Sequence, residues 1–291
     1  MVNEMVNKRE KIAIDDVGEG PIVFLYRNPC GRVILKVATL PTVSKIAGWF
    51  MDRKISSIAI NRFVKKNNID VKEYEERKYK SYNDFFTRKI KDEVRKFDKN
   101  KNSLISPCDS KLTAYEINDK SVFKIKDSYY KIEDLLKNKK LADKYKNGLC
   151  LIFRLCVDDY HRYCYIDDGE KEKNTFIKGV LYTVRPVALE NYNIYKENSR
   201  EYTILHTDNF GDVVHIEVGA TIVGRIKNHH QEYKFTKGEE KGMFEFGGST
   251  IVLLLEKDKV NIDKEILDNT KDGFETIVKI GEKIGTKKAN K

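Results

Sequence analysis

The stretch from Glu239 to Glu256 reads E-E-K-G-M-F-E-F-G-G-S-T-I-V-L-L-L-E. Its apolar run, 251–255, is short and β-branched at its start, which is typical of a buried strand. Gly247 and Gly248 precede that run and permit backbone geometry that a Cβ would forbid. The pattern therefore predicts that Ser249 lies where a turn enters a core strand, beside the unhindered carbonyl of Gly248.

A hydroxyl beside an unhindered carbonyl can have either of two roles. The ordinary one is a local hydrogen bond, because Gly-Ser-Thr sequences are common in turns. The other is attack on that carbonyl, which requires a base to remove the hydroxyl proton. Spacing alone leaves both readings open, so the rest of the chain must decide between them.

Composition limits the classes of protein to consider. The chain has 291 residues, 34% of them charged and 40% hydrophobic, and its residue counts include five cysteines and five histidines. No apolar run approaches the roughly 20 residues that span a bilayer, and the first residues are polar, without a signal-peptide core. The number of cysteines is odd and no two of them form a C-x-x-C pair, which favours a reduced, cytoplasmic protein. The absence of an H-E-x-x-H motif gives a metal site no support.

The net charge of +10 favours an anionic partner. Nucleic acid and an anionic membrane surface both satisfy that charge. Solubility alone is an equally good explanation, so charge by itself does not choose a function.

The N-terminal part of the chain has two patterned segments. Pro21–Ala38 predicts a hairpin around the turn at 28–31, which has proline at its second position and glycine at its fourth. Residues 42–66 predict a helix that carries Trp49 and Phe50 among lysines and arginines. A basic amphipathic helix can lie in a membrane interface, although an ordinary helix packed on the protein gives the same pattern.

The next segment, 71–101, is polar and reads as mainly helical. Ser81 or Asn83 can cap a helix there. The apolar residues that such a helix would bury are Phe85, Phe86 and Ile90.

From residue 104 onward the pattern favours strands separated by turn residues. The predicted strands fall within 104–115 (two strands around a turn at 107–110), 149–157, 178–187, 202–205, 213–218, 220–226 and 274–285, with a short helix at 132–141. The expected fold class is α+β: a mainly antiparallel β catalytic body, 67–291, with an N-terminal helical membrane-associating region, 1–66.

Three residues with complementary chemistry each fall at a turn beside an apolar strand: Asp109, His161 and Ser249. A serine needs a base near neutral pH, and histidine is the usual one. An imidazole in turn needs a carboxylate that fixes its tautomer and stabilises its charged form. His161 is the best candidate of the five histidines, because it ends an apolar strand among acidic and aromatic neighbours.

Five short motifs give these residues a family context. They are Asn83-Asp84-Phe85-Phe86-Thr87-Arg88, Ser106-Pro107-Cys108-Asp109-Ser110, Asp159-Tyr160-His161-Arg162, Val218-Gly219-Ala220 with Val223-Gly224, and Phe246-Gly247-Gly248-Ser249-Thr250. In this order they resemble the phosphatidylserine decarboxylases, a pyruvoyl-dependent family, over roughly 80–285. Two positions depart from the family pattern: Ser110 replaces a glycine, and Cys164 stands where many members carry a second histidine.

The resemblance implies self-processing. His161, oriented by Asp109, takes the proton of Ser249, whose oxygen attacks the carbonyl of Gly248. The amide becomes an ester, β-elimination breaks the chain between 248 and 249, and Ser249 becomes a covalent pyruvoyl cofactor. A large subunit, 1–248, and a small subunit, 249–291, result.

The resemblance also implies the activity: decarboxylation of phosphatidylserine to phosphatidylethanolamine, with the pyruvoyl group as electron sink. His161 is the candidate that returns a proton to the substrate. A lipid substrate favours the membrane reading of the basic charge over nucleic acid, with peripheral binding at the cytoplasmic face of the cell membrane. Arg162, Arg185 and Arg200 are possible phosphate partners, although structural salt bridges explain them equally well.

Two alternatives remain open. A non-catalytic, carrier-like or lipid-binding β module would suit the glycine-punctuated strands, but the chain lacks the lysine-bearing hairpin tip of biotinyl and lipoyl carriers. A serine hydrolase could use Asp109, His161 and Ser249 on an external ester, but there is no G-x-S-x-G elbow.

Overall fold

Strand β15 (Ser249–Leu255) lies inside the largest sheet of the computed structural model, which describes residues 8–14, 21–125, 128–184, 186–189, 192, 194–220 and 225–289. It pairs with β6 (Leu149–Leu155) on one side and β11 (Gly211–Val218) on the other. The sheet continues through β3 (Ser110–Glu116), β17 (Phe274–Val278) and β1 (Lys11–Ala13), and through β10 (Arg200–Thr207), β8 (Gly169–Lys171) and β13 (Tyr233–Phe235), while β9 (Thr175–Ile177) also pairs with β10.

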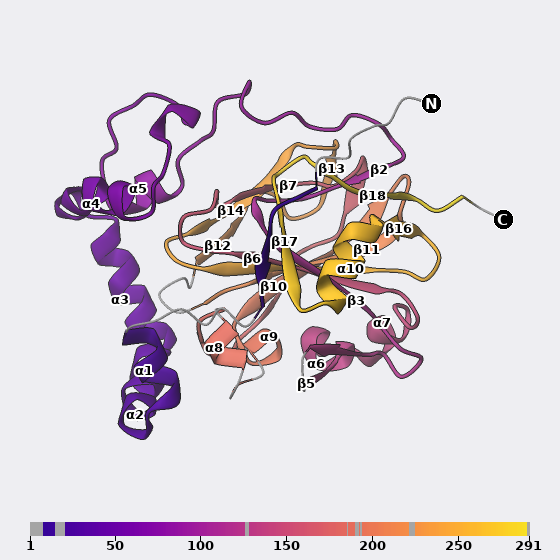
Figure 1. Cartoon of the computed structure of the whole chain (residues 1–291), viewed down its shortest axis with the longest axis horizontal. Coiled ribbons are helices and arrows are strands. Elements are labelled where there is room, and N and C mark those ends of the chain that lie inside the picture. The colour runs from indigo at the N-terminus through magenta and orange to yellow at the C-terminus, as the bar shows by residue number, and fades with distance from the viewer. Residues whose placement is uncertain are drawn as a thin grey trace.

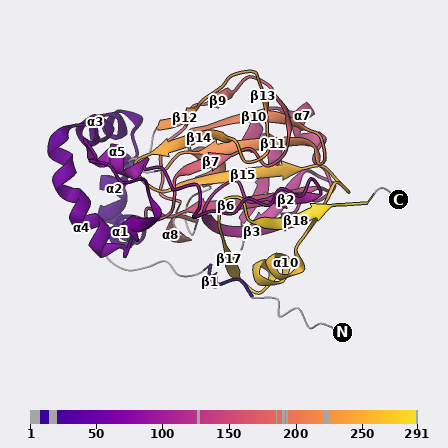
Figure 2. The same ribbon diagram turned by 90° about the horizontal axis from the view of Figure 1, so that it is seen from above.

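Smaller sheets surround this one, and the strand pairs of the described residues are antiparallel (Figure 2). They are β12 (Arg225–Asn228) with β14 (Glu240–Glu245) and β7 (Arg162–Cys164); β16 (Val260–Ile262) with β18 (Lys283–Lys287) and β2 (Ser103–Ile105); and β4 (Val122–Ile125) with β5 (Ser128–Lys131). The predicted α+β class with a mainly antiparallel body is confirmed.

The large sheet is covered on both faces, which explains the unbroken apolar run of β15. Ile251 and Leu253 belong to one apolar cluster, which also includes side chains of β7 and β14. Val252 and Leu254 belong to the cluster on the other face. Because successive side chains of a strand alternate between faces, Ser249 shares the face on which β7 and β14 pack.

The prediction of a hairpin at Pro21–Ala38 is wrong, because helices α1 (Pro21–Arg27) and α2 (Pro29–Ala38) form there instead. The Asn28 side chain accepts hydrogen bonds from the backbone amides of Cys30 and Gly31, and so caps α2. Proline at the first position of a helix is favourable, because the amide that it lacks would have no partner there. Asn-Pro-Cys-Gly is therefore a helix start in this chain and not a hairpin turn.

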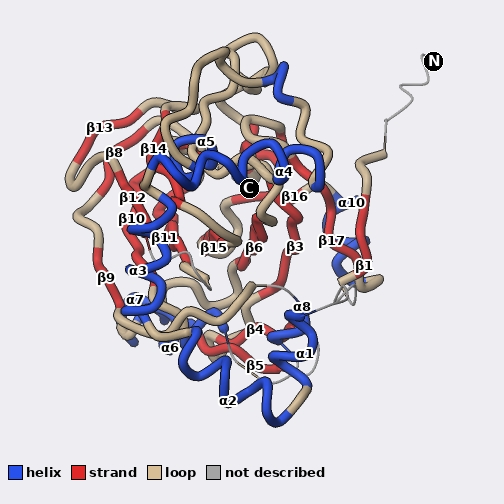
Figure 3. Tube along the Cα trace, turned by 90° about the vertical axis from the view of Figure 1, so that its left-hand side faces the viewer, coloured by secondary structure: helices blue, strands red, loops and turns tan. Residues whose placement is uncertain are grey.

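The predicted helix over 42–66 is present but broken into α3 (Pro41–Met51), the 3₁₀ turn η1 (Lys54–Ile58) and α4 (Ala59–Lys66). At the break, the Ser56 hydroxyl is hydrogen-bonded to the carbonyl of Met51 and accepts a bond from the amide of Tyr82. Figure 1 shows α1 to α4 as an arm along one side of the β body. Figure 3 looks onto this arm, with the strands behind it.

Other predictions have mixed outcomes. Segment 71–101 contains only short helices, η2 (Val71–Glu73) and α5 (Tyr82–Phe86), but Ser81 caps α5 as predicted, and its apolar side chains are buried. The predicted strand at 178–187 is wrong, because an isolated bridge and then α8 (Pro186–Leu189) occupy its described part. The remaining helices are α6 (Ile132–Leu136) and α7 (Lys139–Asp143), which split the predicted helix at 132–141, α9 (Ile194–Glu197) and α10 (Lys264–Lys271).

Part of the predicted strand at 220–226, with the second half of its glycine motif, lies outside the described residues, as does Arg185. The division into 1–66 and 67–291 stays a prediction.

Candidate active site

Three neighbouring interior strands of the large sheet, β3, β6 and β15, have adjacent ends, and the predicted site lies at these ends. Ser249, at the start of β15, pairs with Leu155, at the end of β6. Arg154 pairs with Thr250 on one side and with the second residue of β3 on the other. Asp109, directly before β3, and the turn after β6 that leads to His161 therefore flank the start of β15.

The backbone before Ser249 adopts unusual conformations. Phe246 has a φ of +20° and Gly247 a φ of +115°. Side chains with a Cβ rarely adopt such angles, so the Gly247 conformation requires glycine. A Cβ on Gly248 would lie 3.3 Å from Val184 Cγ2. A positive φ at a non-glycine residue such as Phe246 is typical of functional sites, and here it lies near the peptide bond that the resemblance marks for cleavage.

Ser249 and His161 are both fully buried, and each carries a polar atom without a hydrogen-bond partner: Ser249 Oγ and His161 Nε2. Buried polar atoms are normally paired, so unpaired ones require an explanation, and catalysis is one. The Gly247 backbone lies near enough to the imidazole to raise its pKa against the larger effect of burial. Phe86 holds the imidazole at a ring-centroid distance of 4.2 Å and also contacts Phe246 at 5.6 Å.

The protonation state of His161 follows from its surroundings. The pKa of the imidazole is lowered to about 3, mainly by burial, and the charges of Arg88 and Lys111 contribute in the same direction. Its Nδ1 lies 2.9 Å from the backbone oxygen of Asp159. A neutral imidazole can meet a carbonyl only by donating, so Nδ1 carries the proton and Nε2 keeps a lone pair. A neutral histidine with a free Nε2 is competent as a base.

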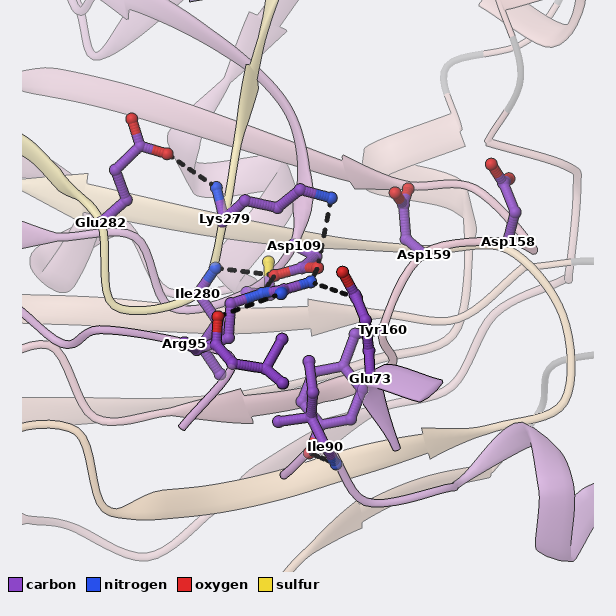
Figure 4. Close-up of polar contacts among 12 residues, drawn as sticks. Glu73, Ile90, Arg95, Asp109, Asp158, Asp159, Tyr160, Lys279, Ile280 and Glu282 are labelled. Carbon is purple, nitrogen blue, oxygen red and sulfur yellow. Dashed lines mark hydrogen bonds and ion pairs between the residues drawn. The ribbon is translucent and has the colours of Figure 1, made fainter. Parts of the chain in front are cut away.

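The described contacts of Asp109 do not include the one with His161 that the resemblance implies. Its carboxylate accepts hydrogen bonds from Arg95 Nη2 at 2.9 Å and from the amide of Ile280 at 2.8 Å, and Lys279 Nζ lies 3.4 Å away (Figure 4). Within the described residues, no hydrogen bond joins this carboxylate to His161. The expected direct contact is therefore absent, because Arg95 and the backbone after β17 already occupy the carboxylate.

The cysteine that replaces a second histidine is not an alternative base. Cys164 is fully buried, and burial raises the pKa of its thiol. Its Sγ contacts the carbonyl of Ser106 at 3.9 Å, which is a weak hydrogen bond. A neutral thiol in the core does not remove a proton at neutral pH. Ser110, the other departure, is buried with an unpaired hydroxyl.

Sequence reasoning missed a clamp on the scissile segment. Asn83 Oδ1 accepts a hydrogen bond from the amide of Phe246 at 3.2 Å, and its Nδ2 donates to Asp52 at 2.8 Å. Arg225 joins Asp52 to Glu245 by ion pairs of 2.6 and 2.9 Å. Asn83 reads as a helix cap in the sequence, and nothing in its local pattern indicates partners so distant along the chain.

Comparison with known proteins places these residues in a family. The phosphatidylserine decarboxylase family model matches residues 82–286, which contain His161, the scissile segment and Ser249. The chain belongs to the phosphatidylserine decarboxylase family. It is 51% identical to phosphatidylserine decarboxylase proenzyme 2 of Clostridium acetobutylicum over 267 residues, which cover 91% of each chain. It is 44% identical to a phosphatidylserine decarboxylase proenzyme of Clostridium botulinum (96% and 95% covered) and 43% identical to one of Desulfitobacterium hafniense (96% and 94%).

Family membership confirms the resemblance that the motifs indicate. Phosphatidylserine decarboxylases are carboxy-lyases, made as proenzymes, that carry a pyruvoyl group formed by self-cleavage. The carrier-like module and the external-ester hydrolase are therefore set aside. Because the substrate of the family is a membrane lipid, this decarboxylase is membrane-associated.

A cavity of about 380 Å³ lies between α3 and the scissile segment. Its lining is mainly apolar, and lysine and arginine side chains stand among the apolar groups. Its lining includes Lys45, Gly48, Lys178, Leu181, Arg225 and Phe246. Two of the three arginines named as possible phosphate partners have structural roles elsewhere: Arg200 donates to backbone carbonyls, and Arg162 donates to Thr87 O and Glu240.

The helical arm exposes an unusual amount of apolar surface. We call this surface the arm face; it consists of Phe24, Val33, Ile34, Val37, Leu40, Ile46, Trp49, Phe50, Ile55 and Ile58. Within the described residues, no one helix has both the length and the hydropathy of a membrane span. Residues 29–38 and 42–51 meet that test only when joined across a 69° bend.

Proposed function

We propose that this decarboxylase cleaves its own chain between Gly248 and Ser249, with His161 as base and Ser249 as nucleophile. His161 Nε2 takes the Oγ proton, and Oγ attacks the carbonyl carbon of Gly248. The peptide C–N bond breaks, an ester C–O bond forms, and the proton passes to the released amine of residue 249. The observation that carries the proposal is that two buried atoms, Ser249 Oγ and His161 Nε2, have no hydrogen-bond partner, and that Phe246 and Gly247, directly before the cleavage site, have positive φ.

The ester then leads to the pyruvoyl group. Loss of the α-proton of residue 249 expels the Gly248 carboxylate and leaves dehydroalanine. Addition of water and loss of ammonia convert dehydroalanine to a pyruvoyl group at the start of the small subunit. The small subunit stays in place because β15 is hydrogen-bonded between β6 and β11 and buried along its whole length.

The chain's residues fit that group and its reaction. A pyruvoyl group on residue 249 supplies the electron sink for decarboxylation. The proposed task of His161 in turnover is to deliver a proton to the substrate α-carbon. Asp109 remains in the proposed site with a changed task, since its bonds to Arg95 and to the Ile280 amide tie the turn after β17 to the start of β3.

Activity and cleavage should rise together, and this relation tests the proposal. Protein sampled at successive times after synthesis is assayed on phosphatidylserine vesicles, and the cleaved fraction is measured on denaturing gels. Phosphatidylethanolamine formation should be proportional to the cleaved fraction, and hydroxylamine, which reacts with ketones, should abolish it. An uncleaved chain that decarboxylates the lipid would contradict the scheme.

We propose that the cavity beside α3 receives the lipid headgroup. It reaches Phe246, two residues before the cleavage site, and Lys45, Lys178 and Arg225 line it. Ammonium and guanidinium groups are the usual partners of phosphate, while the apolar lining suits the start of the acyl chains.

Neutralising two of these cations should weaken substrate binding. For Lys45→Gln combined with Lys178→Gln, we expect KM for dispersed short-chain phosphatidylserine to rise about tenfold, which is about 1.4 kcal/mol of binding. Self-cleavage should keep its rate, because no hydrogen bond or ion pair of the described residues joins either lysine to the scissile segment. Lys139→Gln with Lys140→Gln, on the exposed surface of α7, is the matched control. An unchanged KM in the first pair would rule out the headgroup assignment.

We propose that the arm face lies on the membrane and delivers lipid to this cavity. Helix α3 contributes residues both to the arm face and to the lining of the cavity. Lysine and arginine residues are interspersed with the arm-face residues along the sequence, and a cation near an anionic surface contributes about 1 kcal/mol. Peripheral binding at the cytoplasmic leaflet agrees with the free cysteines of the described chain, which suit a reduced compartment.

Vesicle flotation tests this surface. Wild-type protein should float with anionic vesicles and less so at high salt, because salt screens the basic residues. Trp49→Glu with Phe50→Glu should lose most of that binding, since both side chains are about half exposed on α3. Tyr129→Glu changes an exposed aromatic residue outside the arm and should bind normally. Equal flotation of the double variant would refute the arm-face assignment.

A further inference from the structure

We propose that Lys111 and Asp159 form a positioning pair that fixes the orientation and the tautomer of His161. This inference rests on the proposed role of His161 as base. It assigns to a lysine and to a backbone carbonyl the task that the resemblance gives to Asp109.

The turn after β6 is closed by Asp159. Its Oδ2 accepts a hydrogen bond from the amide of Cys156 at 2.6 Å, and its own amide donates to the carbonyl of Cys156 at 3.0 Å. Lys111, on β3, reaches across and contacts Oδ1 at 2.9 Å and Oδ2 at 2.7 Å. Three donor contacts thus hold one carboxylate, and the carboxylate holds the turn.

The closed turn aims a carbonyl at the imidazole. The backbone oxygen of Asp159 lies 2.9 Å from His161 Nδ1 and therefore requires a proton on Nδ1. The same proton on Nε2 would prevent that nitrogen from accepting the hydroxyl proton of Ser249. Second contacts of this kind commonly set which histidine nitrogen is free to react.

Electrostatics makes Lys111 necessary for the closed turn. Its side chain is 10% exposed and that of Asp159 is 9% exposed, so the ion pair is largely shielded from water. Burial raises the pKa of the Asp159 carboxyl, and Lys111 opposes that shift. Removing one partner of a buried pair leaves a charge without compensation. Asp159 then takes up a proton or the turn opens toward water, and either change weakens the contacts that close the turn.

Asp109 does not compete for this task. Its contacts go to Arg95, Lys279 and the Ile280 amide, whereas Asp159 lies apart from them, near Tyr160 (Figure 4). The two carboxylates that flank the site thus have separate partners, and only Asp159 is connected to the imidazole.

The direct test is nitrogen NMR of histidine in a Ser249→Ala background, in which the chain stays uncleaved. His161 should show a protonated Nδ1 and a bare Nε2. Lys111→Met should lose this signature, and Lys111→Arg, which keeps the charge, should restore it. Glu217→Gln is the matched control, because it disrupts the fully buried ion pair with Lys241, and no described hydrogen bond or ion pair joins either residue to the turn. An unchanged Nδ1–H signature in Lys111→Met would overturn the proposal.

Cleavage kinetics in the Ser249 chain give the second readout. Lys111→Met should slow cleavage about 100-fold, the usual penalty for a misplaced catalytic group, and Lys111→Arg should recover most of the rate. Asp159→Asn, which weakens the ion pair at constant size, should also slow cleavage and serves if Lys111→Met does not fold. If the tautomer changes while cleavage stays fast, the positioning pair stands and the base role of His161 fails.

Discussion

Ser249→Ala is expected to leave the protein as a single 291-residue chain without decarboxylase activity, whereas the wild-type protein separates into two chains on a denaturing gel. The reason is chemical: without Oγ there is no nucleophile for the Gly248 carbonyl and no precursor of the pyruvoyl group. The fold should survive, because the substitution removes one buried hydroxyl that has no hydrogen-bond partner.

A neighbouring residue provides a close control for this variant. Thr250 is also fully buried, and its Oγ1 is also unpartnered. Thr250→Val removes that hydroxyl at nearly constant shape, and we expect normal cleavage because the side chain faces the opposite side of the sheet. A Ser249→Ala chain that still separates into two would show that another residue starts the reaction.

His161→Gln should slow self-cleavage by about 10²- to 10⁴-fold, the range that a positioned general base contributes. Among the described residues, His161 is the base that lies beside the scissile segment, and its Nε2 has no hydrogen-bond partner. The rate is measured from the decay of the uncleaved band at constant pH. His206→Gln is the control, because His206 is half exposed and paired with Asp212 and Glu172 on the surface. Cleavage of His161→Gln at the wild-type rate would exclude the base role.

The same histidine predicts an unusual pH dependence. An ordinary histidine protonates near pH 6.5, but burial lowers the pKa of His161 to about 3. The base therefore stays neutral, and the wild-type cleavage rate should not halve between pH 8 and pH 5.5. The free energy of unfolding, in contrast, should depend on pH. The unfolded chain takes up the proton at a higher pH than the folded chain, so His161 lowers the free energy of unfolding as pH falls from about 6.5 toward the folded pKa.

The β body and the reactive junction could be predicted because their signals are local. The run 251–255 is apolar on both faces of its strand, and residue 247 has a positive φ, which its identity as glycine permits. The hairpin prediction failed because proline and glycine flanking Cys30 suit a turn as well as a helix start. Only the Asn28 side chain, bonded to the amides of Cys30 and Gly31, decides between them.

The supporting contacts of the site could not be predicted, because they join residues far apart in the chain. Asn83 meets Phe246 across 163 positions, and Lys111 meets Asp159 across 48. Asp109 is the carboxylate that the motifs indicate as the partner of His161, but it binds Arg95 instead. Arg95 lies in a polar segment whose local sequence does not indicate this partner. Such pairings depend on which strands become neighbours, which composition and spacing do not encode.

Intact mass spectrometry of the purified protein shows whether Ser249 has cut the chain and become the pyruvoyl group. We predict a large chain that ends at Gly248, and a small chain that begins at position 249 with a ketone in place of a free amine. A single intact chain that converts phosphatidylserine to phosphatidylethanolamine, or a small chain that still begins with unmodified Ser249 in active protein, would contradict the account.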